Sequence, residues 1–240
     1  MNLIIDVGNT RTKLAVFKQD SLEIQVVCNL DQVIEEIVKL KKDYHLEQGI
    51  ISSVVHLDDN FLKELNKQVP IISLTEKTKV PFYNLYKSKD TLGIDRIALV
   101  AAASTLYSNQ NCLIIDAGTC ITYDFLNSNN QYLGGAISPG LRIRYKSLSD
   151  YTDKLPLLNI ADDYNLIGNS TKNSIHSGIL NGIVNEIEGV INQYKSQFGH
   201  LTVVLTGGDS KFLAKQLKNS IFANQNFLLA GLNTILNFNN

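Results

Sequence analysis

Two short segments of the chain place an aspartate, a glycine and hydroxyl side chains directly after an apolar run. Residues 3–12 read LIIDVGNTRT, and residues 113–122 read LIIDAGTCIT. A glycine after a strand permits a tight turn whose backbone N–H groups can donate to phosphate oxygens. The carboxylate at the strand end can hold Mg²⁺ directly or through water, since Mg²⁺ usually takes one or two carboxylates. The pattern therefore indicates polyphosphate binding, and residues 10–13 add hydroxyls and positive charge to the first turn.

The two segments match each other at a constant offset of 110 residues, with identical residues at six positions. Each reads as a buried strand, a glycine turn and a second β-prone segment. Chance similarity of two core strands is the alternative, but identity at a polar aspartate and at a glycine favours duplication. We therefore infer two related domains, each with an Asp-x-Gly turn, and expect a cleft between them.

A third glycine-rich segment, TGGD at residues 206–209, follows the apolar run 201–205. Two consecutive glycines between a strand and a helix would let a flat base or a ribose approach the backbone closely. The Walker spacing GxxxxGK[ST] and the GxGxxG fingerprint are absent, which disfavours P-loop and Rossmann chemistry. The four histidines lack the paired spacing that metal sites use.

The rest of the chain predicts the elements that position these turns. Alternating strand and helix patterns indicate α/β layers. We expect helices over residues 31–42, 93–107, 171–197 and 209–219, and a long polar surface loop over 76–92. Isoleucine recurs every four residues along the long helix, which favours core packing or a helix–helix interface, and we consider this helix a dimer contact.

Composition excludes several classes of protein. The 240 residues carry 22 Lys and Arg against 23 Asp and Glu, and 44% are hydrophobic, so the chain can bury a core and is not disordered. It has no basic block with which to grip nucleic acid or a membrane surface, and its apolar runs are too short to span a bilayer. Three cysteines without CxxC spacing favour reduced thiols in the cytoplasm.

Together these motifs resemble the actin-like/hexokinase ATPase superfamily, and within it the type III pantothenate kinases. The narrower resemblance rests on DVGNTRTK at 6–13, TLGIDR at 91–96, DAGT at 116–119, YLGGAISPGL at 132–141, IGNST at 167–171 and TGGD at 206–209. It implies an α/β fold of two ribonuclease-H-like domains with an interdomain cleft. The expected division is 1–108, with the first phosphate motif and the substrate loop, and 109–240, with the second phosphate motif and the adenosine motif.

The resemblance implies ATP-dependent phosphorylation of pantothenate to 4'-phosphopantothenate, the first step of coenzyme A biosynthesis. Asp95 matches the catalytic residue that accepts the hydroxyl proton, and Asp6 would orient Mg²⁺, directly or through water. Asp116 matches a monovalent-cation site, for K⁺ or NH₄⁺. The residues that match ATP-binding positions are Asp6, Val7, Gly8, Asn9, Thr10, Arg11, Thr12, Lys13 and Thr119.

The residues that match pantothenate-binding positions are Tyr86, Gly93, Ile94, Asp95, Arg96 and Thr171. Arg96 could serve either a substrate carboxylate or the transferring phosphoryl group. The resemblance also implies a cytoplasmic homodimer in which the partner helps to close the pantothenate site. Cys120 stands where the family often has alanine, and we expect it to pack as a small hydrophobe.

Plainer interpretations exist for several of these residues. Asp95 could cap its helix or form an ion pair, Thr171 could cap the long helix, and Tyr86 could be an ordinary loop aromatic. Two other functions compete with the pantothenate kinase. One is a kinase of the same fold that acts on a sugar or on acetate, and the other is a nucleotide-binding regulatory protein with little catalysis.

Overall fold

The computed structural model describes residues 1–240, which divide into two compact units. Unit 1 consists of Met1–Ser108, Asn130–Tyr132 and Asn226–Asn240, and unit 2 consists of Asn109–Asn129 and Leu133–Gln225. The structure differs from the expected division at two places. Residues 130–132 and 226–240, expected in the second half, belong to unit 1.

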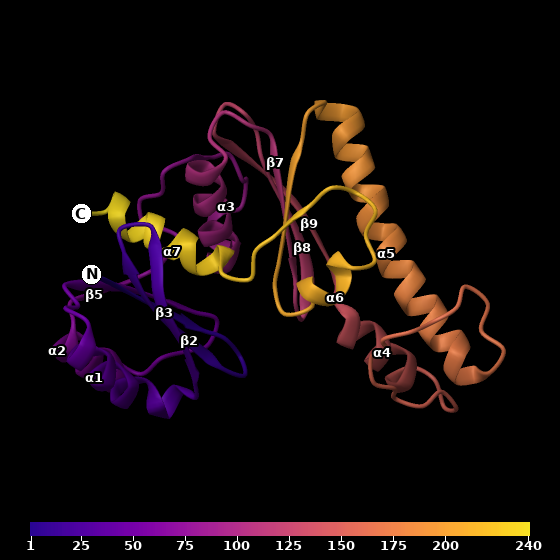
Figure 1. The fold of residues 1–240 in the computed structure, drawn as a ribbon, viewed down its shortest axis with the longest axis horizontal. Coiled ribbons are helices and arrows are strands. Elements are labelled where there is room, and N and C mark those ends of the chain that lie inside the picture. Colours follow the sequence, from indigo (N-terminus) through magenta and orange to yellow (C-terminus); the bar gives the residue numbers. More distant parts are fainter. The chain divides into compact units, whose positions relative to one another are not determined.

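Unit 1 is built on a five-stranded sheet with the order β3-β2-β1-β4-β5. Its elements are β1 (Asn2–Val7), β2 (Thr12–Lys18), β3 (Ser21–Cys28), α1 (Val33–Asp43), β4 (Gln48–Ser53), α2 (Asp59–Gln68), β5 (Ile71–Ser73), β6 (Tyr83–Asn84), α3 (Ile94–Leu106) and α7 (Phe227–Phe238). The C-terminal helix α7 packs beside α3 (Figure 1). Gly231 of α7 allows this close approach, because a Cβ there would lie 1.8 Å from the carbonyl oxygen of Ala98 in α3.

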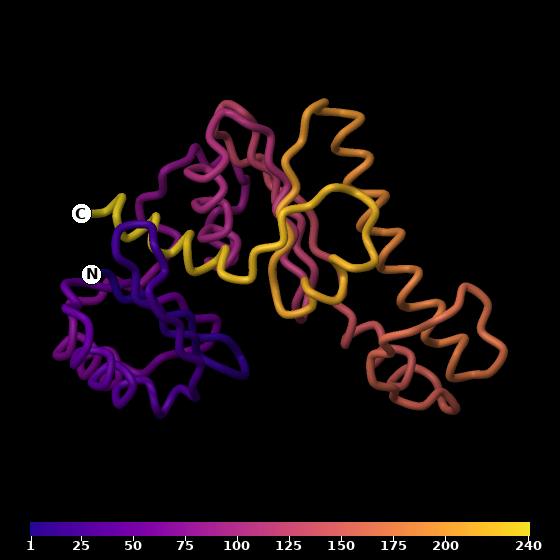
Figure 2. The backbone as a smooth tube through the Cα atoms, in the orientation of Figure 1, coloured from indigo at the N-terminus to yellow at the C-terminus, as the bar shows by residue number.

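Unit 2 has a sheet in which β11, β10, β7, β8 and β9 follow one another. Its strands are β7 (Cys112–Ala117), β8 (Cys120–Leu126), β9 (Gln131–Pro139), β10 (Thr202–Thr206) and β11 (Phe222–Ala223). Its helices are α4 (Leu141–Asp150), α5 (Thr171–Phe198) and α6 (Ser210–Ala214), and the course of the chain through them is seen in Figure 2. The first two residues of β9 belong to unit 1, where they pair with β6.

The two units repeat one topology, as the duplicated segments predict. In unit 1 the central strand β1 is antiparallel to β2 and parallel to β4, and in unit 2 the central strand β7 is antiparallel to β8 and parallel to β10. Each unit follows three strands with a helical segment, a fourth strand, a helix and a fifth strand. Asp6 and Asp116 therefore lie at the same place, near the end of the central strand of each sheet.

The second strands of the two hairpins are not related by the offset of 110 residues. Asp6 lies opposite Lys13 in unit 1, whereas Asp116 lies opposite Thr122 in unit 2. The turn of unit 2 is therefore one residue shorter. Thr122 thus takes the structural place of Lys13, although the sequence alignment pairs it with Thr12.

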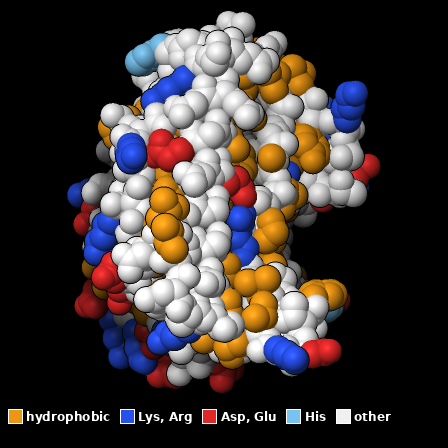
Figure 3. Space-filling model, turned by 90° about the vertical axis from the view of Figure 1, so that its right-hand side faces the viewer, with side chains coloured by type: hydrophobic (Ala, Val, Ile, Leu, Met, Phe, Trp, Pro, Cys, Tyr) orange, Lys and Arg blue, Asp and Glu red, His pale blue; other side chains and the backbone are white.

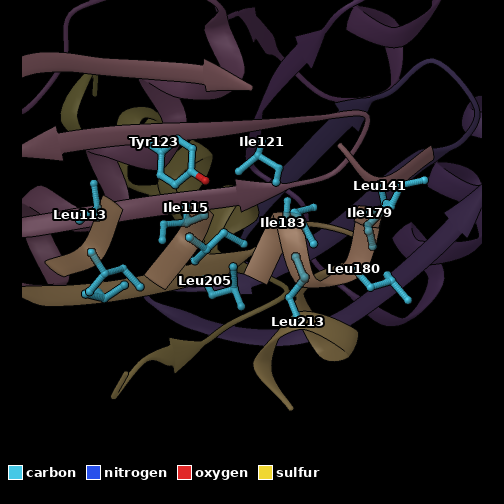
Figure 4. Close-up of a cluster of buried hydrophobic side chains, with 14 of the residues drawn as sticks. Leu113, Ile115, Ile121, Tyr123, Leu141, Ile179, Leu180, Ile183, Leu205 and Leu213 are labelled. Carbon is cyan, nitrogen blue, oxygen red and sulfur yellow. The ribbon is translucent and has the colours of Figure 1, made fainter. Parts of the chain in front are cut away.

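The core of unit 2 forms between the sheet and the long helix α5 (Figure 4). Its five regularly spaced isoleucines are all buried: Ile175, Ile179, Ile183, Ile187 and Ile191. They pack with Leu113, Ile115 and Leu205 of the sheet. This confirms core packing for the isoleucine stripe, and any dimer contact of α5 would have to use its other faces, because the chain's own sheet covers the stripe.

Several element boundaries differ from the sequence expectation. The helix expected from residue 31 begins at Val33 and is preceded by a 3₁₀ turn at Leu30–Gln32 whose cap is Asn29; Asp31, a candidate cap by its residue type, lies inside that turn. The loop 76–92 contains the two-residue strand β6 and a 3₁₀ turn at Lys89–Thr91. The helix expected through Asn219 ends at Ala214.

Acidic and basic side chains both occur on the face shown in Figure 3, without a large area of one sign, and much of that face is neither charged nor hydrophobic. Such mixing agrees with the near balance of 22 basic and 23 acidic residues. No helix of the chain combines the length and the apolar character that crossing a membrane requires.

Candidate active site

Asp6 is the predicted metal-orienting residue of unit 1, and it lies on β1, which β2 and β4 flank. Lys13 of β2 is its antiparallel partner, and Ser52 of β4 is its parallel partner. Residues paired across neighbouring strands present their side chains to the same face of a sheet. A cation and a hydroxyl therefore flank the carboxylate, and Ser52 was not found by sequence reasoning because no motif contains it.

The pKa of Asp6 is raised from its ordinary value to about 6. Burial is the main cause, because it disfavours the charged carboxylate; the charge of Lys13 opposes this shift, and the charge of Asp95 adds to it. Asp95 is thus close enough to Asp6 for the two charges to interact. The structure brings together the first phosphate motif and the predicted catalytic residue within unit 1.

The turn that follows Asp6 contains the other predicted ATP-binding residues of this motif. Gly8 N donates to Arg11 O at 3.1 Å and closes the turn. The side chains of Asn9, Thr10 and Arg11 are exposed, whereas those of Val7 and Thr12 are buried, each only 1% accessible. Val7 and Thr12 can therefore meet a nucleotide only through their backbone.

Asp95 lies in the first turn of α3, where the helix dipole stabilises a negative charge. Its Oδ1 accepts a hydrogen bond from Arg96 N at 2.8 Å. Gly93 occupies the N-cap position and Ile94 is the first helical residue. The helix-terminal role that the sequence suggested is thus present.

Tyr86 and Arg96, two predicted substrate-contacting residues, lie together. The guanidinium carbon of Arg96 lies 5.5 Å from the centroid of the Tyr86 ring, within the range of a cation–π contact. Arg96 is 5% exposed, and Tyr86 is partly buried. The Tyr86 backbone is fixed as well, because its N–H donates to Asn84 Oδ1 at 3.0 Å.

Tyr132, at the start of β9, holds the segment that carries Tyr86. The two rings stack with centroids 5.9 Å apart and an interplanar angle of 17°. Leu85 N donates to Tyr132 O at 3.0 Å. Sequence reasoning placed Tyr132 in a motif but gave it no role, since nothing in the spacing indicates that the loop pairs with this strand.

In unit 2, Asp116 lies between two hydroxyl residues, with Thr122 opposite it on β8 and Thr206 beside it on β10. Gly207 follows Thr206 with φ +92°, a conformation that L side chains rarely adopt. A Cβ at Gly207 would lie 2.3 Å from Asp116 Oδ1 and 2.4 Å from Ala117 O. The first glycine of TGGD therefore lets its turn rest against the second phosphate motif.

Thr119, the predicted nucleotide contact of unit 2, lies exposed in the β7–β8 turn. Its carbonyl oxygen accepts a hydrogen bond from Gly140 N at 3.0 Å. The next residue, Cys120, is also exposed, so the expectation that it packs as a small hydrophobe is wrong. It opens β8 at a position whose side chain points away from the core.

Asp209, the last residue of TGGD, has a raised pKa because burial disfavours its charge, an effect that Arg142 of α4 opposes. The start of α4 is therefore near the TGGD turn. The β7–β8 turn, the β9–α4 junction and the β10–α6 turn form one group in unit 2.

Thr171 is the first residue of α5, and its side chain is exposed. The cap of this helix is Ser170, whose Oγ accepts from Asn173 N at 3.2 Å. The capping role considered for Thr171 is thus wrong. Leu166 and Ile167, just before it in the chain, are 78% and 82% exposed.

The structure contains no cluster of three acidic, histidine or cysteine side chains that could hold a metal alone. Each motif aspartate has instead a buried hydroxyl beside it, in strand register, that lacks a hydrogen-bond partner: Ser52 Oγ beside Asp6 and Thr122 Oγ1 beside Asp116. Single carboxylates with hydroxyl neighbours suit cations that keep several waters, and oxygen donors suit hard cations. The residues present fit both predicted cations.

Two solved structures share the fold over nearly the whole chain. A protein from Campylobacter jejuni named for the Baf family of transcriptional activators is 25% identical, with a TM-score of 0.65, and covers 99% of this chain and 98% of its own. A ROK family glucokinase from Streptomyces griseus is 10% identical, with a TM-score of 0.55, and covers 99% and 98%. The α/β fold of the sugar kinases thus confirms the predicted fold class.

Several curated proteins are more similar to this chain in sequence than these two structures are. Proteins named type III pantothenate kinase from Christiangramia forsetii and Flavobacterium johnsoniae are 51% and 47% identical; the first match covers 100% of this chain and 99% of the relative, the second 97% and 96%. One from Bacteroides fragilis is 42% identical, over 100% and 99%. The family model described as type III pantothenate kinase matches residues 2–193. The chain belongs to the type III pantothenate kinase family.

Proposed function

We propose that this chain transfers the γ-phosphoryl group of ATP to the primary hydroxyl of pantothenate, the first step of coenzyme A biosynthesis. The observation that supports this most strongly is the interaction of Asp6 and Asp95 in unit 1. A phosphoryl transfer needs a group near the phosphates and a proton acceptor near the incoming hydroxyl. These two carboxylates, from distant parts of the sequence, meet both needs.

In the proposed reaction the hydroxyl oxygen forms a bond to the γ-phosphorus, the bond from that phosphorus to the bridging oxygen breaks, and ADP leaves. The hydroxyl proton passes to the carboxylate of Asp95, which must lie about 2.6–3.2 Å from the hydroxyl in the reactive complex. Arg96 and Tyr86 would hold the rest of the substrate. The cation–π contact fixes the guanidinium, so it can meet an anionic oxygen without searching for its position.

Asp6 would hold Mg²⁺ directly or through water, with Lys13 beside it to face the phosphates. When bound, Mg²⁺ supplies charge neutralisation at the β- and γ-phosphates. Asp116, with Thr122 beside it, would hold a monovalent cation, K⁺ or NH₄⁺, near the nucleotide. The backbone of residues 6–13 and Thr119 would cradle ATP.

Thr171 would reach the pantothenate of a partner subunit in a homodimer. The support is that two adjacent large apolar side chains, Leu166 and Ile167, are exposed beside it, since contiguous exposed apolar surface marks contact sites whereas scattered single side chains do not. The composition, with three free cysteines, suits an enzyme of the cytoplasm.

A substrate comparison tests the proposal. Purified enzyme is offered ATP with pantothenate, glucose or acetate, with and without potassium, and ADP formation is measured. The expected result is turnover with pantothenate alone, and a rate that drops at least tenfold when potassium is replaced by sodium. Turnover with glucose or acetate instead would assign a different acceptor, and ATP binding without turnover would favour a regulatory protein.

A further inference from the structure

A polar network in unit 2 surrounds the junction between β9 and α4. Arg144, on the first turns of α4, donates from Nε to Pro139 O at 2.8 Å and from a terminal nitrogen to Ser138 Oγ at 3.0 Å. The same terminal nitrogen pairs with the carboxylate of Glu186 on α5. One guanidinium thus ties the last residues of β9 to two helices.

Glu186 extends the network to the hairpin of the second phosphate motif. It accepts a hydrogen bond from the hydroxyl of Tyr123 at 2.9 Å. Tyr123 lies on β8 with its ring in the core of unit 2 (Figure 4). Burial alone would raise the pKa of Glu186, but hydrogen bonds from Arg144, Ser138 and Tyr123 and the charge of Arg144 outweigh it and lower that pKa. Glu186 is therefore ionised, and the pair is charge-assisted.

The junction held by this network touches the turn that carries Thr119. Gly140, next to Pro139, donates to Thr119 O. A Cβ at Gly140 would lie 2.1 Å from Gly118 O and 2.5 Å from Thr119 O, so the two backbones are in direct contact. A displacement of Pro139 would move Gly140, and with it the support of the turn.

We infer that Arg144 is a positioning residue for nucleotide binding: together with Glu186 and Tyr123 it fixes the Pro139–Gly140 junction against the β7–β8 turn and so holds Thr119 where it meets ATP. This inference rests on the proposed function, in which Thr119 contacts the nucleotide. Arg144 is required as arginine, because a planar guanidinium presents several donors in a fixed geometry whereas a lysine ammonium is a point charge on a flexible stem.

The inference is tested with Arg144→Met, Arg144→Lys and Tyr123→Phe. Lys146→Met is the matched control, since Lys146 lies on the same helix, is exposed, and is 3.9 Å from Asp150 in a surface ion pair. The measurements are kcat, the KM for each substrate, and the Kd of ADP by calorimetry.

We expect Arg144→Met to raise the KM for ATP and the Kd of ADP about tenfold, in line with the loss of charge-assisted hydrogen bonds. The KM for pantothenate should stay within about twofold of wild type, since the network holds the β7–β8 turn, whereas residues 86–96 lie in unit 1 and Thr171 lies at the far start of α5, fifteen residues before Glu186. Arg144→Lys should recover part of the loss, Tyr123→Phe should raise the ATP KM by a smaller factor, and Lys146→Met should behave as wild type.

Values within twofold of wild type for Arg144→Met and Tyr123→Phe, or an equal rise in both KM values, would overturn the inference. If Arg144→Met does not fold, as thermal melting would reveal, Tyr123→Phe decides. If the wild-type enzyme does not phosphorylate pantothenate, the proposed function fails, and the Kd of ADP still decides the role of Arg144.

Discussion

The carboxylates of Asp6, on the central strand of unit 1, and of Asp95, at the start of α3, lie close enough for the charge of Asp95 to raise the pKa of Asp6. The helix that carries Asp95 is fixed by α7, which returns from the end of the chain and packs on it. The C-terminal segment thus takes part in placing the predicted proton acceptor, although it carries no motif of its own.

The raised pKa of Asp6 predicts an acidic limit of activity. Because the pKa of Asp6 is raised to about 6, protonation of its carboxylate should lower kcat/KM for ATP about tenfold per pH unit below that value. Lys13→Met should move this limb to higher pH, since Lys13 lowers the pKa of Asp6. The profile is measured from pH 5 to 9, and a flat profile down to pH 5 contradicts the prediction.

The ionised carboxylate of Asp6 should also lower the free energy of unfolding at neutral pH. The pKa of Asp6 in the folded state is raised from its ordinary value of 3.8 to about 6, so the folded state binds more protons than the unfolded state between these two values, and stability falls as pH rises through that window. We expect Asp6→Asn to raise the free energy of unfolding at pH 8 by on the order of 1–3 kcal/mol while it abolishes activity. Urea unfolding measures the change, and a loss of stability would contradict the assignment of burial as the main cause.

Gly207 and Gly208 provide a matched pair of substitutions. Gly207→Ala introduces a Cβ within 2.4 Å of Asp116 and Ala117 at φ +92°, whereas a Cβ at Gly208 meets nothing within 4 Å. We expect Gly207→Ala to destabilise the protein by about 1–3 kcal/mol and to weaken ADP binding at least tenfold. Gly208→Ala should change the free energy of unfolding by little, and equal losses of stability for the two substitutions would disprove the close approach of the turns.

Tyr132 should affect the use of pantothenate through Tyr86. The two rings stack, and the Tyr86 ring lies under the guanidinium of Arg96. We expect Tyr132→Leu to raise the KM for pantothenate about three- to tenfold and to leave the Kd of ADP unchanged, since one aromatic pair contributes about 0.5–1.5 kcal/mol. Tyr132→Phe, which keeps the stacked ring, is the control. If Tyr132→Phe raised the KM for pantothenate as much as Tyr132→Leu does, the effect would belong to the hydroxyl of Tyr132 and not to the stack.

The exposed segment before Thr171 predicts where a second copy binds. Ile167→Asp places a charge at a side chain that is 82% exposed, so the fold of the monomer should persist. If the homodimer uses this segment, light scattering will show that Ile167→Asp is a monomer. The KM of this variant for pantothenate will then rise, as will the KM of Thr171→Ala. A dimer of unchanged stability would place the contact elsewhere.

The sequence predicted most of the fold because the duplicated segment carries a strong pattern, an apolar strand that ends in Asp-x-Gly. The buried isoleucine stripe of α5 and the loop around Tyr86 followed from periodicity and polarity. The docking of α7 on α3 could not be predicted, since Gly231 and the alanines of α3 give no periodic signal of their contact.

The site was predicted in the same uneven way. Motif spacing identified Asp6, Asp95 and Asp116, but the neighbours that hold or flank them come from strand register. Ser52 and Tyr132 belong to partners that only the folded sheet defines. Thr122 aligns with Thr12 in the repeat but lies at the place of Lys13 in the structure, because a turn shorter by one residue shifts the strand register without changing the motif.

The most direct test of the proposed chemistry is a single-turnover measurement with Asp95→Asn. The variant keeps the size of the side chain and can still accept a hydrogen bond from the Arg96 backbone. The account predicts that it binds ATP and pantothenate with near wild-type Kd but forms phosphopantothenate about 10²–10⁴ times more slowly, the usual contribution of a general base. A rate within a few fold of wild type would show that Asp95 does not accept the proton.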